Sequence, residues 1–388
     1  MRKTTASLAV LGVAAAMSLA ACGSSDKSSS GDSSSSSSDS ASASPSASSS
    51  SSSSSAGGAV DGKGAKIGII LPDTTSSPRW VTADPEALKA NCKTYNLTCN
   101  IQNAGASASK MQTIARQMTS SGIKVLMIVN LDPASGAKIE QEAAKAGVVT
   151  IDYDRLTPGG GAALYVSFDN VKVGQVQGQT LTQCPQVQGQ KAVKYVDIDG
   201  APTDNNATLF AQGYDGVLGK TAGWKRVAKQ TGNWDAPTAG RVFSSMLGKN
   251  PDLKAVMVAN DTMAGAVITD LKRQSLNGKV AVSGQDASAE GLQHILDGDQ
   301  CFTIYKPSVS EAAPAIKAAA QLANGQVPDT KGVTIQDPQT KKKVPAILAT
   351  PTAVTIKNVA QPINDKYTPK NSVCTGKYAA KCTKAGVK

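Results

Sequence analysis

The sequence has few of the residues on which most metal sites and many catalytic sites depend. Its 388 residues include a single histidine, His294, and no two cysteines form a Cys-x-x-Cys pair. Zinc sites use several His and Cys ligands at short spacing, so a zinc site is excluded. His294 falls in a helical stretch, Ala289–Leu296, and we interpret it as a packing or surface residue rather than a catalyst. We expect no cofactor, no metal and no catalytic residue.

Long apolar runs are also missing, except at the N-terminus. Arg2 and Lys3 precede an apolar stretch, residues 8–21, that is shorter than the ~20 residues a membrane span needs. A charged start, a short apolar region and small residues before a cut are typical of a secretory signal. The end of the stretch, Leu19-Ala-Ala-Cys22, resembles a lipobox, which implies cleavage before Cys22, lipidation of its sulfur and anchoring to the outer face of the cell membrane. An ordinary signal peptide with an incidental Cys is the alternative.

A serine-rich stretch follows the signal. Residues 24–55 are almost all Ser, a composition that cannot form a core, so we predict a disordered tether. A flexible chain of about 42 residues has a root-mean-square span of about 35 Å. We therefore assign residues 1–21 to a lipoprotein signal peptide and residues 22–64 to a lipid-anchored tether that keeps the folded part near the membrane.

The basic charge does not gather in one place. The formal net charge of +11 becomes +9 when Arg2 and Lys3 leave with the signal. A basic balance is compatible with nucleic-acid binding, but the lysines are scattered and the only tight run is Lys341-Lys-Lys343. We interpret the charge as favouring solubility and contact with anionic cell-wall polymer, and we expect no nucleic-acid partner.

Six cysteines remain after the lipobox cysteine, and an even number in an exported chain favours disulfides. Two of them flank a short helix-to-strand turn, two lie close together near the C-terminus, and the last two are then left to each other. The spacing therefore predicts the pairs Cys92–Cys99, Cys374–Cys382 and Cys184–Cys301.

From residue 65 onward, short apolar runs alternate with segments of helical periodicity. In the first half we expect strands at 66–71, 98–102, 123–129, 148–151 and 163–168, and helices at 84–95, 107–121 and 133–146. The alternation then restarts, with helices at 171–182, 206–219, 236–248, 262–274 and 287–296, and strands at 191–198, 224–230, 253–259, 280–283 and 301–305. This pattern predicts an α/β protein with parallel, doubly wound sheets.

Two such halves, joined near residues 168–170, predict two lobes with a ligand-binding cleft between them. A helix at 308–324 is expected to return to the first lobe, and the segment after Pro345 to the second. Several hinge strands would then allow the lobes to close without unfolding. The predicted N-terminal lobe comprises residues 65–168 plus 307–344, and the C-terminal lobe comprises residues 169–306 plus 345–388.

Polar side chains follow the predicted strands at their carboxyl ends, where open α/β sheets bind ligands. The buried run Val148-Val-Thr-Ile151 stops at Asp152, Asp154 and Arg155, and the other strands lead to similar groups. Sugar hydroxyls both donate and accept hydrogen bonds, so a sugar site needs carboxylates together with Arg, Lys or amide donors. An indole supplies the flat apolar partner for the C–H face of the ring, and two of the three Trp residues stand at strand ends. Asp and Asn are common in loops, so only the joint pattern predicts a sugar site.

The motifs at these ends resemble one family. They are Ser77-Pro-Arg-Trp80, Tyr153-Asp-Arg155, Val166-Ser-Phe-Asp-Asn170, Thr203-Asp-Asn-Asn-Ala207, Asn260-Asp261, Ser283-Gly-Gln-Asp286 and Thr303-Ile-Tyr-Lys-Pro307. In this order they look like D-xylose-binding and multiple-monosaccharide-binding proteins, the substrate-binding components of ABC sugar importers with the type I periplasmic binding protein fold. The resemblance covers roughly residues 65–360.

The resemblance implies that the protein is a monomer that captures a monosaccharide, with D-xylose as the first candidate. It also implies that the protein delivers this sugar to an ABC permease and its ATPase. A broader aldose binder, or a sugar receptor that feeds a signalling system, is the alternative. Around Trp234 the loop length differs from the family pattern. The implied sugar ligands are Arg79, Asp154, Arg155, Asn206, Asn260, Asp286 and Lys306, with Trp80 and Trp234 on the two faces of the ring.

Two other functions are less consistent with the sequence. Asp152 and Asp154 resemble the carboxylate pair of a glycosidase, but they lie on one strand and share one face, whereas a hydrolase places its carboxylates on either side of the bond. A sugar-responsive repressor shares the fold, but the export signal and the lack of an N-terminal helix-turn-helix argue against it.

Overall fold

The computed structural model describes residues 60–388. The predicted signal peptide, Cys22 and nearly all of the predicted tether lie outside the described residues.

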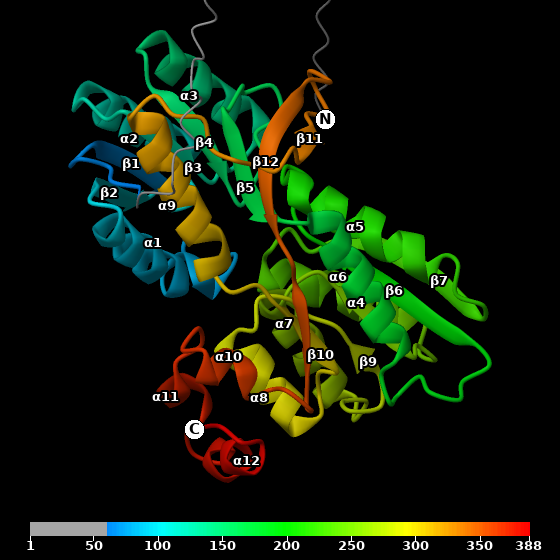
Figure 1. Cartoon of the computed structure of the whole chain (residues 1–388). Helices are drawn as coiled ribbons and strands as arrows, with labels where there is room; N and C mark the ends of the chain where they lie inside the picture. Colours follow the sequence, from blue (N-terminus) through cyan, green and yellow to red (C-terminus); the bar gives the residue numbers. More distant parts are fainter. Residues whose placement is uncertain (1–59) are drawn as a thin grey trace, which may run out of the picture. The chain divides into compact units, whose positions relative to one another are not determined.

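The first lobe is built on a seven-stranded sheet with the order β11-β12-β5-β4-β3-β1-β2 (Figure 1). Five parallel strands come from its first segment: β1 (Lys66–Leu71), β2 (Thr98–Asn103), β3 (Val125–Ile128), β4 (Val149–Tyr153) and β5 (Leu164–Phe168). The other two, β11 (Thr334–Gln336) and β12 (Lys343–Ala349), form an antiparallel hairpin, and β12 also pairs in parallel with β5. The sequence pattern did not predict this hairpin.

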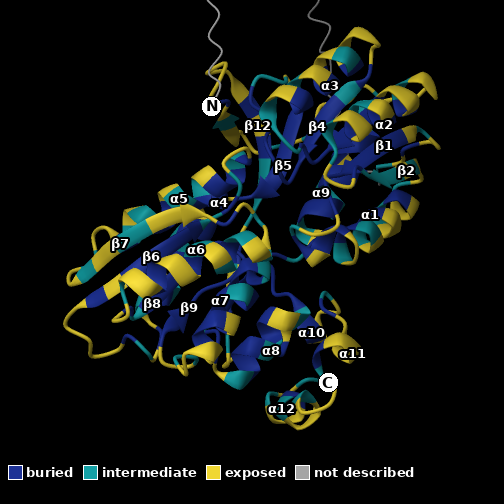
Figure 2. Ribbon diagram, turned by 180° about the vertical axis from the view of Figure 1, so that it is seen from behind, coloured by how far each residue is buried: buried dark blue, intermediate teal, exposed yellow. Residues whose placement is uncertain are grey.

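Four α-helices and a short 3₁₀ helix accompany this sheet. They are η1 (Pro78–Trp80), α1 (Ala83–Thr94), α2 (Ala108–Ser120), α3 (Pro133–Lys145) and α9 (Val309–Ala323). Ile67 and Ile69 of β1 pack with α1 and α9, while Ile70 on the opposite face packs with α2 and α3. Because helices cover both faces, the central strands are buried and form nearly continuous apolar runs (Figure 2).

The second lobe repeats this arrangement on a smaller sheet with the order β7-β6-β8-β9. Its strands are β6 (Val193–Asp199), β7 (Trp224–Thr231), β8 (Ala255–Val258) and β9 (Ala281–Val282), and β10 (Phe302–Tyr305) pairs antiparallel with β13 (Thr352–Thr355). Its helices are α4 (Asn170–Thr182), α5 (Asn205–Leu218), α6 (Ala236–Lys249), α7 (Asp261–Arg273), α8 (Ala289–Asp297), α10 (Gln361–Asn364), α11 (Lys370–Val373) and α12 (Tyr378–Lys384). Helices α6 and α7 share one core with the sheet, and α4 and α5 share the other.

The chain crosses between the lobes three times: from β5 to α4, from β10 to α9 and from β12 to β13. The Asp169 N–H donates to the Ala349 carbonyl at 3.0 Å, so two of these crossings are bonded to each other. The predicted boundary between residues 344 and 345 falls inside β12, whose residues up to Ala349 pair with β5. The third crossing therefore lies at residues 350–351, because β12 completes the first sheet before the chain leaves it.

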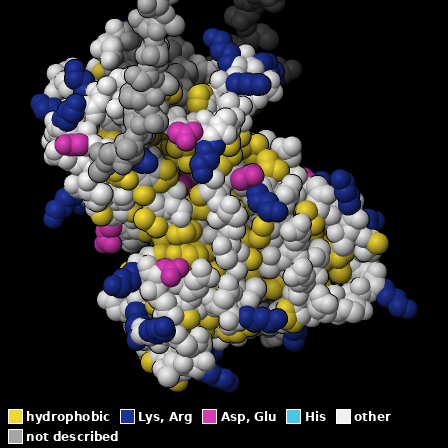
Figure 3. Space-filling view, in the orientation of Figure 1, with side chains coloured by type: hydrophobic (Ala, Val, Ile, Leu, Met, Phe, Trp, Pro, Cys, Tyr) yellow, Lys and Arg dark blue, Asp and Glu magenta, His cyan; other side chains and the backbone are white. Residues whose placement is uncertain are grey.

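The surface matches the scattered charge of the sequence. On the face drawn in Figure 3, Lys and Arg side chains are spread over the molecule and do not form one patch. In the part of the chain that the structure describes, no helix combines the length and apolar character needed to cross a membrane.

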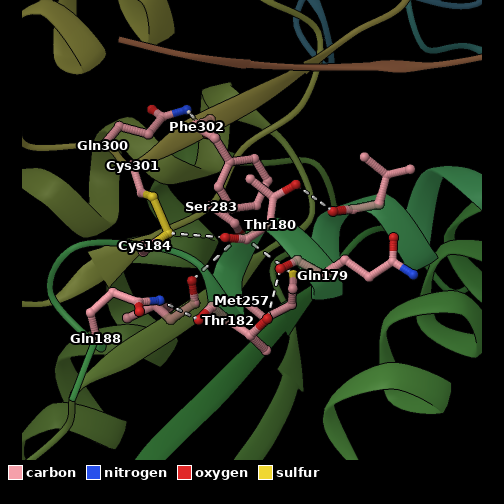
Figure 4. Close-up of a disulfide and its surroundings, with 12 residues drawn as sticks. Gln179, Thr180, Thr182, Cys184, Gln188, Met257, Ser283, Gln300, Cys301 and Phe302 are labelled. Carbon is pink, nitrogen blue, oxygen red and sulfur yellow. Dashed lines mark hydrogen bonds between the residues drawn. A yellow bond between two sulfur atoms is a disulfide. The ribbon is translucent and has the colours of Figure 1, made fainter. Parts of the chain in front are cut away.

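The three predicted disulfides are present: Cys92–Cys99, Cys184–Cys301 and Cys374–Cys382. Cys184 follows α4 and Cys301 precedes β10, so the second disulfide connects elements 117 residues apart within the second lobe (Figure 4). The other two connect neighbouring segments with sequence separations of 7 and 8.

Candidate functional site

One pocket collects polar side chains from the strand ends of both lobes. Its free volume is about 30 Å³, so the lining side chains nearly fill it in this conformation. The nine residues predicted from the sequence all line this pocket: Arg79, Trp80, Asp154, Arg155, Asn206, Trp234, Asn260, Asp286 and Lys306. That they contact a sugar stays a prediction.

Arg79, on η1 after β1, is the most heavily bonded of these residues. Its Nε and Nη2 atoms donate to the two carboxylate oxygens of Asp84 at 2.7 and 2.8 Å, and its Nη1 donates to Asp154 Oδ2 at 2.9 Å. Nη2 also contacts the carboxyl of Glu311, which comes from α9. Arg79 has five N–H groups and these bonds use four, so one N–H on Nη1 has no partner among residues 60–388 and can donate to a ligand.

Three buried carboxyls thus face one guanidinium, and one of them holds a proton. Burial raises the pKa of Glu311 to about 8; Arg79 opposes this rise, while Asp154 and Asp84 add to it. Burial also acts to raise the pKa of Asp154, but Arg79 outweighs it, with help from Lys306 and Arg155, and lowers that pKa below its ordinary value. At neutral pH, Asp154 is therefore ionised and Glu311 is neutral.

Asn206, at the start of α5, connects the second lobe to the first. Its Nδ2 donates to the carbonyl of Asp154 at 2.9 Å and to Asp154 Oδ1 at 3.2 Å, and its Oδ1 accepts from Asn170 Nδ2 at 2.9 Å. Asp154 itself has a left-handed φ of 63°. Asn206 lines the pocket, but the protein already uses most of its hydrogen-bonding capacity.

Asn260 makes a second connection between the lobes. Its Nδ2 donates to the carbonyl of Ser76 at 2.9 Å, while its Oδ1 accepts from the N–H of Met263 and caps the N-terminus of α7. The side chain therefore has a helix-capping role as well as a place in the pocket.

The two indoles are fixed by polar neighbours. Trp80 Nε1 donates to Ser76 Oγ at 3.2 Å, and the Arg79 guanidinium lies 4.5 Å from the centre of the Trp80 ring. Trp234 Nε1 donates to Asp204 Oδ2 at 3.2 Å. Trp234 also lies against Gly200, where a Cβ atom would come within 2.0 Å of the indole, so the glycine is needed for this close approach.

The Asp286 end of the pocket offers acceptors that have no partner in the described part of the chain. Ser77 Oγ, Gln285 Oε1 and Asp286 Oδ1 are buried and have no hydrogen-bond partner among residues 60–388. Lys306 Nζ lies 3.5 Å from Asp286 Oδ1, which is too long for a strong hydrogen bond. Buried polar groups are normally satisfied, so these atoms point to a polar ligand.

The charges that line the pocket balance. Arg79, Arg155 and Lys306 supply three positive groups, and three carboxylates oppose them. Two of the contacts are short, with Arg155 Nε at 3.0 Å from Asp204 Oδ2 and Arg79 at 2.9 Å from Asp154. An anionic ligand requires an excess of cations, so this arrangement suits a neutral polar molecule.

Comparison with known proteins decides the family. Residues 67–326 match the family described as periplasmic binding protein domain. The chain is 32% identical over 309 residues to the D-xylose-binding periplasmic protein of Escherichia coli, covering 78% of this chain and 90% of that protein. This chain belongs to the periplasmic binding protein family.

Other relatives agree with this assignment. The binding protein is 30% identical over 317 residues to a D-xylose-binding periplasmic protein of Haemophilus influenzae, covering 80% of this chain and 92% of that protein. The crystal structure of a carbohydrate transporter solute binding protein from Chloroflexus aurantiacus, in complex with D-glucose, superimposes with a TM-score of 0.71 at 28% identity, covering 79% of this chain and 97% of that one. The predicted α/β fold with two parallel-sheet lobes is confirmed, and the chain is a solute-binding protein rather than an enzyme.

The geometry around Asp152 agrees with a binding protein. The prediction that Asp152 and Asp154 share one face is wrong, because Asp154 lies beyond the end of β4 with a left-handed backbone. Asp152 does not line the pocket, and its carboxylate accepts from the N–H of Thr157 at 2.7 Å. Asp152 and Glu140 form a buried carboxyl pair inside the first lobe. Burial raises the pKa of Asp152 to about 6 and that of Glu140 to about 10, and the charge of Asp152 adds to the rise at Glu140.

Sequence reasoning did not select five further residues that line the pocket. Asp204 and Gln285 lie within the strand-end stretches that were recognised, and Phe210 stands one helical turn after Asn206 on the same face of α5. These spacings were available signals. The five residues are Ser76, Ser77, Asp204, Phe210 and Gln285.

Proposed function

We propose that this binding protein captures a neutral monosaccharide between its two lobes and delivers it to an ABC permease with its ATPase. D-Xylose is the first candidate for this ligand. The observation that carries the proposal is the lining of the pocket. Three cations and three carboxylates balance there, beside two indoles and buried acceptors that have no partner within the described residues. Neutral polyols use such donors and acceptors, and their C–H faces pack on indole rings.

The relatives support the same class of ligand. Two of them are named D-xylose-binding proteins, one from Azospirillum brasilense is a multiple sugar-binding periplasmic protein, and the Chloroflexus protein is in complex with D-glucose. A broader aldose specificity is therefore the second candidate, and the choice depends on whether the pocket accommodates a hydroxymethyl group.

Binding requires the lobes to separate first. The lining side chains from both lobes enclose the pocket and leave about 30 Å³ free, so the ring enters when the contacts across the pocket open. Asn260–Ser76 and Asn206–Asp154 are such contacts, and both re-form beside the ligand when the lobes close. A ligand shifts this equilibrium only if it binds the closed form more tightly than the open one.

A thermal-shift panel tests the ligand class. D-Xylose, L-arabinose, D-glucose, D-galactose, D-ribose and the acidic sugar D-glucuronate are compared at one concentration. We expect the largest rise in melting temperature with D-xylose and none with D-glucuronate, because a carboxylate meets a balanced pocket. The proposal is contradicted if the melting temperature rises only with D-glucuronate, or if no sugar of the panel raises it.

Transport and location need separate measurements. We propose that the protein is exported and anchored at Cys22, so Cys22→Ala should release it into the medium while leaving ligand binding unchanged. Deletion of the protein should abolish uptake of the radiolabelled ligand. Normal uptake with loss of a sugar response identifies the alternative, a receptor that feeds a signalling system.

A further inference from the structure

The last 33 residues of the chain pack beneath the Asp286 end of the pocket. They follow β13 and lie beyond the matched family region, which ends at residue 326. We call residues 356–388 the C-terminal brace; it contains α10, α11, α12 and the Cys374–Cys382 disulfide, and it lies beside α8 in Figures 1 and 2.

The brace bonds directly to the segment that presents Asp286. Thr368 Oγ1 donates to the carbonyl of Ala287 at 2.7 Å, and both residues are buried. From the other side, the N–H of Asp286 donates to the Ile304 carbonyl at 2.8 Å, and that of Ala287 to Thr303 Oγ1 at 3.0 Å. Strand β10 and the brace therefore hold this segment between them.

The segment needs such support because its backbone is unfavourable. Asp286 has a φ of 94° and Ala287 a φ of 46°, and non-glycine residues adopt these values only at an energetic cost. Such a conformation persists only when the surroundings fix it. It directs Gln285 and Asp286 into the pocket, where each has a buried acceptor atom without a partner among the described residues.

The brace is itself fixed to the second lobe. Val373 and Cys382 pack with Leu292 and Ile295 of α8. Asp297, at the end of α8, accepts from Lys377 Nζ, Tyr378 OH and Lys381 Nζ at 2.8, 2.8 and 2.6 Å. Tyr367 packs edge-on against Tyr305, with the ring centres 5.1 Å apart.

We propose that the C-terminal brace is a positioning element of the ligand site, and that Thr368 sets the backbone that aims Gln285 and Asp286 at the bound sugar. The inference rests on the proposed function for its ligand. It assigns a role to the C-terminal disulfide, which keeps α11 and α12 together beneath this segment.

The two short disulfides provide a matched test. Cys92–Cys99 and Cys374–Cys382 have sequence separations of 7 and 8, so their removal should lower stability by similar amounts. Only the second belongs to the brace. We expect C374S/C382S to weaken binding of the best sugar of the panel by about tenfold, and C92S/C99S to leave it unchanged, by calorimetry. Equal affinities in the two variants overturn the proposal.

A second pair of variants tests Thr368 alone. Thr368→Val keeps the shape but leaves the Ala287 carbonyl buried without its donor, so we expect a loss of about tenfold in affinity. Thr368→Ser keeps the hydroxyl and should bind within about twofold of the wild type. A loss of stability in Thr368→Val with unchanged affinity shows a purely structural role and contradicts the proposal.

Hydrogen exchange of the ligand-free protein separates the brace from the ligand assignment. We expect faster exchange of the Asp286 and Ala287 amides in C374S/C382S and in Thr368→Val, and no change in C92S/C99S. This result supports the brace even if the wild type binds no monosaccharide, an outcome that refutes the proposed function alone. Unchanged exchange at these amides refutes the brace.

Discussion

Arg79 and Asp154 form a hydrogen-bonded ion pair of 2.9 Å, although 75 residues separate them in the sequence. They follow β1 and β4, which have only β3 between them in the sheet, so the two strand ends lie close together. Asp154 also accepts from Asn206 of the second lobe. The carboxylate of Asp154 thus connects Arg79 of the first lobe to Asn206 of the second lobe at the pocket.

Removal of Arg79 should affect both folding and binding. Arg79→Ala leaves Asp84 and Asp154 buried without their cation, so we expect a loss of about 3–5 kcal/mol in unfolding free energy and of about 2 kcal/mol or more in ligand binding. Urea unfolding and calorimetry measure the two effects. Arg116→Ala is the matched control, because Arg116 pairs with Glu142 on the surface and its side chain is 57% exposed; both quantities should change by less than about 0.5 kcal/mol.

Asn260→Asp should separate lobe contact from helix capping. A carboxylate still caps α7 by accepting from Met263, but it cannot donate to the Ser76 carbonyl and instead repels it. We therefore expect nearly unchanged thermal stability with weaker ligand binding. Asn260→Ala also loses the cap and should lose about 1 kcal/mol of stability as well. If Asn260→Asp binds as tightly as the wild type, the contact with Ser76 does not contribute to closure.

Glu311 should make stability depend on pH in one window. Its ordinary pKa of 4.5 describes the unfolded chain, and its pKa in the folded protein is about 8. Between these values the unfolded state has lost the Glu311 proton and the folded state keeps it, so the contribution of Glu311 to the stability of the wild type falls as pH rises from about 4.5 to about 8 and changes no further above. Glu311→Gln cannot ionise and lacks this contribution.

The comparison of these two proteins by urea unfolding at several pH values isolates Glu311. The unfolding free energy of the wild type minus that of Glu311→Gln should decrease across the window. A constant difference from pH 4.5 to 8 shows that Glu311 does not hold its proton in the folded protein.

The long disulfide should stabilise the protein more than the short ones. Cys184–Cys301 has a sequence separation of 117 and Cys92–Cys99 one of 7, and loop-closure entropy predicts contributions of about 5 and about 2.5 kcal/mol. Replacing each pair by serine and measuring urea unfolding tests this order. Equal losses contradict a chain-entropy origin of the effect.

Much of the fold and the lining of the pocket follow from local pattern. Buried runs ending in charged residues mark the strand ends, and parallel strands bring those ends to one edge, so Arg79, Asp154 and Asp286 were predictable from sequence. The contribution of Glu311 was not, because the expected return of the helix at 308–324 to the first lobe does not show which of its side chains meets Arg79.

Other features depend on tertiary contacts without a local signal. The first strand of the hairpin, β11, is mostly exposed and has only three residues, while β12 is partly buried and pairs with β5. Asn206 and Asn260 were predicted as ligands from the family resemblance, but only the structure shows that their amides bond across the lobes. A sequence identifies a polar group at a strand end, whereas its partner is decided by how the lobes meet.

A crystal structure of the protein with D-xylose tests the central claim most directly. We predict the ring between Trp80 and Trp234, with its hydroxyls within hydrogen-bond distance of Gln285 Oε1, Asp286 Oδ1 and the free N–H of Arg79. A sugar bound elsewhere, or a ring that contacts neither indole nor Asp286, contradicts the account.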